Sequence, residues 1–156
     1  MSKDPHIDLR VPRGAQALVI MVHGAGASKE WGFFPWLAEV LSEEHLAVCR
    51  FTMSQPEDLG RVVRDCQTRV ALPTFLFGHA EGGSIALAAA SNVPNLRGVI
   101  TWSTSTIAAS NLTVPLLLIN SGEIAAEDVS RITISGDDRE LTLVAAVTAR
   151  FICAYS

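Results

Sequence analysis

Short runs of apolar residues recur along the chain, and amphipathic stretches separate them. The clearest run is Ala17–Val22, which is continuously apolar and therefore typical of a strand covered on both faces. In residues 36–45 the apolar side chains recur at helical spacing, and the charged side chains lie opposite them. Because strand-like and helical segments alternate, we expect an α/β fold, a three-layer α/β/α sandwich with a mostly parallel sheet.

The bounds of the predicted elements follow from these periods and from the Gly, Pro and Ser residues between them. We expect strands at residues 7–11, 17–22, 47–51, 74–77, 98–102, 115–120 and 131–135. We expect helices at residues 36–45, 58–70, 84–91 and 140–155. No internal repeat or linker interrupts the pattern, so the sequence predicts a single domain over residues 1–156.

Composition narrows the class of protein and of partner. The 156 residues are 49% hydrophobic and 18% charged, as expected for a globular domain. The net charge of −4 comes without a basic tract, which argues against a nucleic-acid partner. The apolar runs are well short of the ~20 residues of a membrane helix, so we expect no membrane insertion.

Two features of the sequence predict a cytoplasmic location. Residues 1–5 lack the apolar region of a signal peptide. The three cysteines are scattered and odd in number, which favours reduced thiols over a disulfide framework.

A strand-to-helix turn within residues 74–87 has the outline of a nucleophile elbow without a nucleophile. An apolar strand runs into glycines, and a helix of small residues follows. In the motif G-x-S-x-G, a serine stands on a tight turn with its hydroxyl exposed above the sheet. Here the frame is Gly78-x-Ala80-x-Gly82, and a methyl group cannot attack a carbonyl carbon.

Further motifs fall in order around this turn. They are Val22-His23-Gly24-Ala25-Gly26 after the first buried strand, Arg50-Phe51-Thr52-Met53-Ser54 after the next, and Gly136-Asp137-Asp138-Arg139 before the last helix. With these motifs the chain resembles the α/β-hydrolase superfamily, in its dienelactone-hydrolase-like and small serine esterase branch. The resemblance implies a shortened, minimal α/β-hydrolase fold without a cap domain and with a degenerate catalytic triad.

The resemblance also implies where the triad would lie, and each position departs from the family's pattern. Ala80 stands at the nucleophile position, and Arg139 stands at the position of the general-base histidine. The acid position falls on Ala125, and three nearby carboxylates could substitute for it: Glu123, Glu127 or Asp128. Acyl transfer needs a nucleophile and a base, so we expect no useful ester hydrolysis through an acyl-enzyme.

The hydrogen-bond donors of such a site would survive these replacements. The backbone N–H of Glu81 and one from residues 24–26 could point into a common site and bind a carbonyl or a carboxylate. The residues expected to bind a ligand are His23, Gly24, Ala25, Glu81, Trp102 and Ser103.

Several polar residues near the turn have open alternatives. His79 either packs beneath the turn or acts as a base, and Asp137 and Asp138 either cap the last helix or serve as catalytic acids. Arg139 is either solvated or available to bind a carboxylate or phosphate in bidentate fashion. No pair of histidines has metal-ligand spacing, so we expect no metal and no cofactor.

Four functional hypotheses follow. The leading one is a pseudo-hydrolase that binds a small carbonyl or carboxylate ligand, or that serves as a partner in a homo- or hetero-oligomer. The second is a serine ester hydrolase whose nucleophile was deliberately replaced, although the histidine missing at Arg139 argues against a single engineered change. The third is a lyase or cyclase on the same fold, and the fourth is an interaction module.

Overall fold

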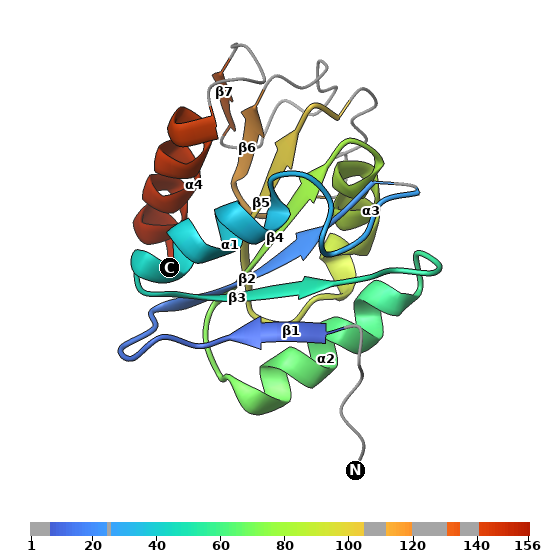
Figure 1. Ribbon diagram of the computed structural model, residues 1–156, viewed down its shortest axis with the longest axis horizontal. Coiled ribbons are helices and arrows are strands. Elements are labelled where there is room, and N and C mark those ends of the chain that lie inside the picture. Colours follow the sequence, from blue (N-terminus) through green and yellow to red (C-terminus); the bar gives the residue numbers. More distant parts are fainter. Residues whose placement is uncertain (1–6, 25, 105–111, 120–130, 135–140) are drawn as a thin grey trace.

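Among the residues that the structure describes, seven strands form the central sheet, in the order β1-β3-β2-β4-β5-β6-β7. The computed structural model in Figure 1 describes residues 7–24, 26–104, 112–119, 131–134 and 141–156. β1 runs antiparallel to β3, and the other neighbouring pairs are parallel. The strands are β1 (Ile7–Arg10), β2 (Ala17–Val22), β3 (Leu46–Phe51), β4 (Thr74–His79), β5 (Leu96–Trp102), β6 (Leu116–Ile119) and β7 (Arg131–Ile134).

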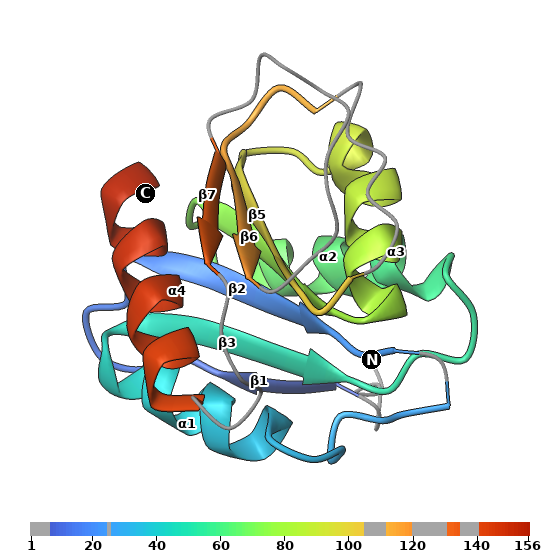
Figure 2. The same ribbon diagram turned by 90° about the horizontal axis from the view of Figure 1, so that it is seen from above.

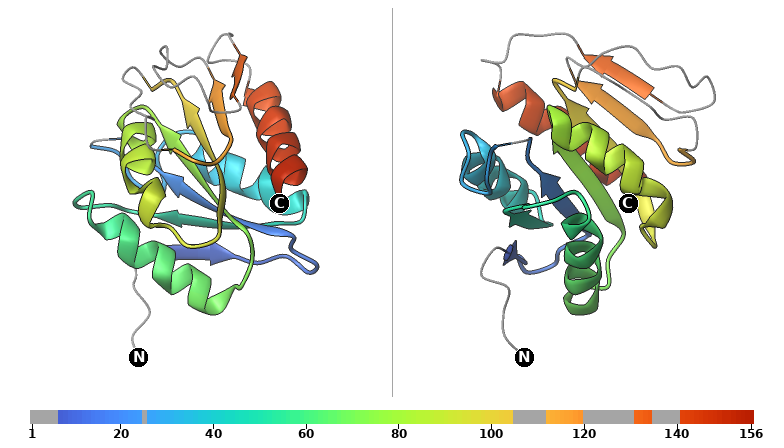
Figure 3. Two further views of the ribbon diagram at one scale, coloured as in Figure 1. Left: turned by 180° about the vertical axis from the view of Figure 1, so that it is seen from behind. Right: turned by 90° about the vertical axis from the view of Figure 1, so that its right-hand side faces the viewer.

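Helices cover both faces of this sheet, as Figure 2 and Figure 3 show. α1 (Phe34–Glu43) and α4 (Leu141–Tyr155) pack on one face. α2 (Asp58–Arg69) and α3 (Glu81–Ala89) pack on the other, and the short 3-10 helix η1 (Ala90–Asn92) follows α3. Among the described residues, none of the helices is long and apolar enough to cross a membrane.

β2 shows how the sequence pattern produces the core. All its residues are fully buried, as the continuous apolar run predicts. Val19 and Met21 pack against the α1 and α4 side, whereas Leu18 and Ile20 pack against the α2 and α3 side, because successive side chains in a strand point to opposite faces. Burying one such side chain stabilises the fold by roughly 1.5–3 kcal/mol.

The predicted α/β architecture is confirmed. The largest difference between a predicted and an observed element boundary is at the start of α3, beside the elbow. α3 begins at Glu81, three residues before the predicted start at Ser84. The sequence prediction assigned Gly82 and Gly83 to the glycine-flanked turn and began the helix after them. The structure places both glycines inside the first turn of the helix, where neighbouring groups approach too closely for a side chain.

Parallel strands bring the carboxyl ends of β2, β4 and β5 to one edge of the sheet. The registers pair Val22 with Gly78 and His79 with Trp102. The loop after β2, the elbow after β4 and the residues after β5 therefore meet, which is where ligands bind in open α/β sheets.

The close approach of α3 to β2 gives a prediction about stability. A Cβ on Gly82 would overlap the carbonyl oxygen of Val22, so we expect Gly82→Ala to lower the free energy of unfolding by about 3 kcal/mol. The matched control is Gly60→Ala in α2, where the nearest atom to the new Cβ is Arg64 Nη1 at 3.5 Å. This control should be neutral or raise stability by up to ~1 kcal/mol.

Urea denaturation of the two variants measures the difference. Equal midpoints for Gly82→Ala and Gly60→Ala would contradict the tight contact between the elbow helix and β2.

Candidate functional site

The turn after β4 holds Ala80 in a strained conformation. Ala80 has φ 53° and ψ −123°, a region that residues with a side chain rarely adopt and that costs about 1–3 kcal/mol. The surrounding backbone fixes this geometry. The Ala80 N–H donates to Trp102 O at 2.9 Å, and Ala80 O accepts from the Gly83 N–H at 3.1 Å and from Thr104 Oγ1 at 2.8 Å.

The loop after β2 lies against this bend. A Cβ built on Gly24 would stand 3.5 Å from Ala80 Cβ and 3.8 Å from the Glu81 nitrogen. Glu81 begins α3, and the N–H groups in the first turn of a helix have no partner within the helix. The structure thus brings together Gly24, the Ala80 methyl group and the Glu81 N–H, at a helix end that favours negative charge.

His23 shapes the loop and is almost completely buried, with 2% of its surface exposed. Its Nε2 accepts the Met53 N–H at 2.8 Å, so the ring is the tautomer that carries its proton on Nδ1. Nδ1 then donates to Gly24 O at 2.7 Å. With both nitrogens bound to backbone, His23 acts as a brace between the loops after β2 and β3.

Arg50 on β3 is a residue of this region that the sequence prediction missed. Its side chain is 8% exposed and pairs with Asp8 Oδ2 at 2.6 Å and with Glu30 Oε1 at 3.5 Å. Its Nη1 also donates to Lys29 O at 2.9 Å, which ties the loop to β3. The available signal was an arginine inside the buried run of β3, because a buried charge needs partners.

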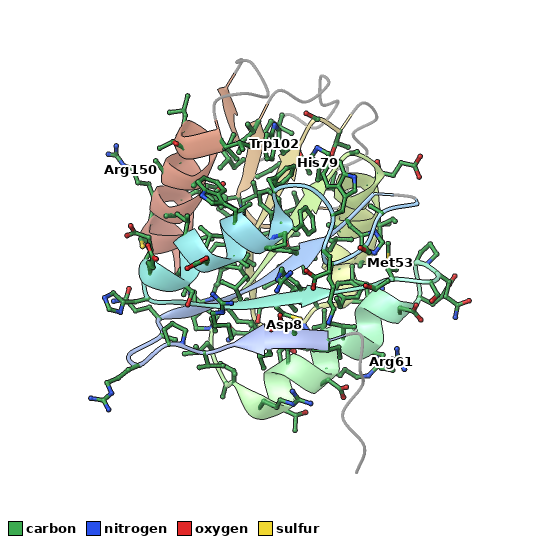
Figure 4. The ribbon with its side chains drawn as sticks, viewed as in Figure 1. Asp8, Met53, Arg61, His79, Trp102 and Arg150 are labelled. Carbon is green, nitrogen blue, oxygen red and sulfur yellow. The ribbon has the colours of Figure 1, made fainter. Side chains whose placement is uncertain are left out.

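Four aromatic rings, which we call the aromatic cluster, lie next to the bend: Trp31, Phe33, His79 and Trp102. Phe33 and Trp102 have ring centroids 4.3 Å apart, and Trp31 and His79 are 4.9 Å apart. His79 is also 5.0 Å from Phe33 and 5.4 Å from Trp102, beside which Figure 4 shows it. The rings come from the loop before α1, from β4 and from β5, and His79 immediately precedes Ala80.

The remaining predicted site residues differ in their exposure. Trp102 is buried, and Ser103 is half-buried at φ 55°, with its N–H donating to Ile119 O at 3.0 Å. The Glu81 side chain is exposed at the start of α3. The other predicted positions lie outside the described residues: Ala25, Glu123, Glu127, Asp128, Asp137, Asp138 and Arg139.

Several titratable groups with shifted pKa values lie on β3 and α2, away from the elbow. A hydrogen bond to Cys66 and burial raise the pKa of Cys49, and the same bond lowers the pKa of Cys66. Backbone N–H groups of Ser54 and Gln55 lower the pKa of Asp58. Within the described residues, no group of three or more His, Cys, Asp or Glu side chains could hold a metal ion.

Comparison with known proteins identifies the fold. No protein-family model and no curated protein matches the sequence. Solved structures do match it. A dienelactone hydrolase from Anabaena variabilis is 20% identical with a TM-score of 0.82, over 96% of this chain and 91% of that one. The esterase domain of a Rhodothermus marinus protein is 18% identical with a TM-score of 0.73, over 94% and 91%.

A third solved structure agrees. Mouse alpha/beta hydrolase domain-containing protein 10 is 14% identical with a TM-score of 0.70, over 100% of this chain and 98% of that one. The chain therefore has the α/β-hydrolase fold that the sequence resemblance predicted.

The strain at the bend gives a second prediction. Glycine adopts the Ala80 conformation without a steric cost, so Ala80→Gly should raise the free energy of unfolding by about 1 kcal/mol. The control Ala88→Gly changes an exposed residue of α3 and should lower it by about 0.5–1 kcal/mol. Thermal unfolding followed by circular dichroism reports the two shifts, and shifts of the same sign would contradict the strained bend.

Proposed function

We propose that this protein binds a small carbonyl or carboxylate ligand noncovalently at the elbow and does not hydrolyse esters. The observation that carries the proposal is the group formed by Gly24, the Ala80 methyl and the Glu81 N–H. We assign to the Glu81 N–H and a backbone N–H of the neighbouring loop the role that oxyanion donors have in an acyl-transfer enzyme, and the Ala80 methyl is unable to form the covalent bond.

The electrostatics favour an oxygen ligand with negative charge. A helix N-terminus stabilises a nearby anion by ~0.3–1 kcal/mol at an exposed site, and charge-assisted hydrogen bonds to backbone N–H groups add to this. The hydrogen bonds of His23 and Arg50 to this loop hold Gly24 in position before a ligand binds. Because His23 and Arg50 bind backbone carbonyls of the loop, less conformational freedom is lost on binding.

The missing nucleophile limits the chemistry. In a serine hydrolase, loss of a triad member leaves only ~10³–10⁴-fold acceleration over water. Ala80 removes the nucleophile, and Arg139 replaces the residue expected to accept its proton. We therefore assign the fold's remaining hydrogen-bond donors to binding.

Binding can be tested by changing the space between loop and elbow. Gly24→Ala would add a methyl group at ordinary contact distance, 3.5 Å from Ala80 Cβ, so the variant should fold. The same methyl would lie 3.8 Å from the Glu81 nitrogen and should weaken the binding of butyrate about tenfold, equivalent to about 1.4 kcal/mol. The readout is the chemical shift of the Glu81 backbone amide in an NMR titration.

Gly60→Ala on α2 is the matched control and should bind butyrate as the unchanged protein does. The proposal fails if butyrate does not shift the Glu81 amide, or if Gly24→Ala and Gly60→Ala bind it equally well.

The catalytic part of the proposal needs restored residues. Ala80→Ser should hydrolyse short-chain aryl esters no faster than the unchanged protein, because the base is missing. Adding Arg139→His should raise the rate by about 10²-fold, the lower part of what a general base contributes. Strong activity in Ala80→Ser without the second change would instead identify an ester hydrolase whose nucleophile had been replaced.

A further inference from the structure

The aromatic cluster beside the elbow is divided by exposure. Trp102 is 2% exposed and belongs to the core on the α1 and α4 side, whereas Trp31 is 41% exposed. His79 stacks at 30° to the Trp31 ring, and Phe33 meets the same ring nearly edge-on at 76°. Trp31 thus keeps about two-fifths of its surface exposed while its ring contacts His79, the residue that precedes Ala80.

Backbone hydrogen bonds hold the segment that carries Trp31. The Trp31 backbone N–H donates to Ser28 O at 3.0 Å, and the Trp31 backbone carbonyl accepts the Phe34 N–H at 3.0 Å. The neighbouring Lys29 carbonyl is held by Arg50. A ligand ring that contacts Trp31 meets an aromatic side chain that is already in position, so less conformational freedom of the protein is lost on binding.

We infer that the ligand of the elbow site carries a planar aromatic ring, which stacks on Trp31 while its carboxylate meets the Gly24 and Glu81 backbone. This inference rests on the proposed function and specifies its ligand class. The geometry points to a ring joined to the carboxylate by a short chain, because Trp31 contacts His79 and His79 adjoins Ala80. Offset-stacked and edge-to-face aromatic pairs contribute binding energy beyond that of the area they bury, which an aliphatic ring of equal size does not.

Matched probes separate the ring from the carboxylate. We compare 3-phenylpropionate with 3-cyclohexylpropionate, which has the same charge and similar size but no π-face, and with butyrate, which has no ring. The unchanged protein should bind 3-phenylpropionate about tenfold more tightly than either of the other two. Quenching of tryptophan fluorescence and NMR shifts of the Glu81 amide provide the two readouts.

Two tryptophans of nearly equal exposure supply the variants. Trp31→Ala should remove the tenfold preference for 3-phenylpropionate and leave butyrate binding unchanged. Trp36 on α1 is 39% exposed and lies outside the aromatic cluster, so Trp36→Ala should change neither. Trp31→Leu keeps apolar volume without an aromatic face and should also lose the preference, which guards against a misfolded alanine variant.

The outcomes distinguish the two proposals. If butyrate binds but 3-phenylpropionate binds no tighter than 3-cyclohexylpropionate, the aromatic inference is overturned and the proposed function stands. Retention of the preference in both Trp31→Ala and Trp31→Leu would also overturn the inference. If no carboxylate shifts the Glu81 amide, the proposed function fails, and the aromatic inference fails with it.

Discussion

The contact between the first turn of α3 and the end of β2 is the constraint on which the site depends. Gly82 lies so close to the carbonyl oxygens of Val22 and His23 that no side chain fits between them. The helix must therefore start directly against the sheet, and the chain must reverse within one residue. That residue is Ala80, whose positive φ follows from the packing on either side of it.

Two buried polar side chains hold the backbone of the loop after β2. His23 joins the loops after β2 and β3, and Arg50 joins the same region to β1 through Asp8. Buried polar groups are costly unless they are hydrogen-bonded, and both are satisfied here. The fold thus uses polar bonds to position backbone that would otherwise be free, and a preorganised backbone is what binding of an oxygen ligand requires.

The sequence predicted the fold well because the apolar periods are strong and the strands are fully buried. It also predicted the elbow and the loop beside it, since glycine spacing reports close backbone approach. It missed the Arg50 network and the joining of Trp31 with His79, because residues far apart in the chain meet there only through the sheet order. It also predicted the start of α3 three residues too late, because the tertiary packing that offsets glycine's low helix propensity is not visible in the sequence.

Ala80 places an inert methyl group at a strained strand-to-helix bend, where the proposed function requires that no covalent bond forms. The most direct measurement is the intact mass of the purified chain after exposure to an excess of a fluorophosphonate, which forms a stable bond with an activated serine hydroxyl. The account predicts an unchanged mass. A stoichiometric adduct that peptide mapping places within the segment containing Ala80 and Ser84 would contradict it, because the elbow would then hold a reactive nucleophile.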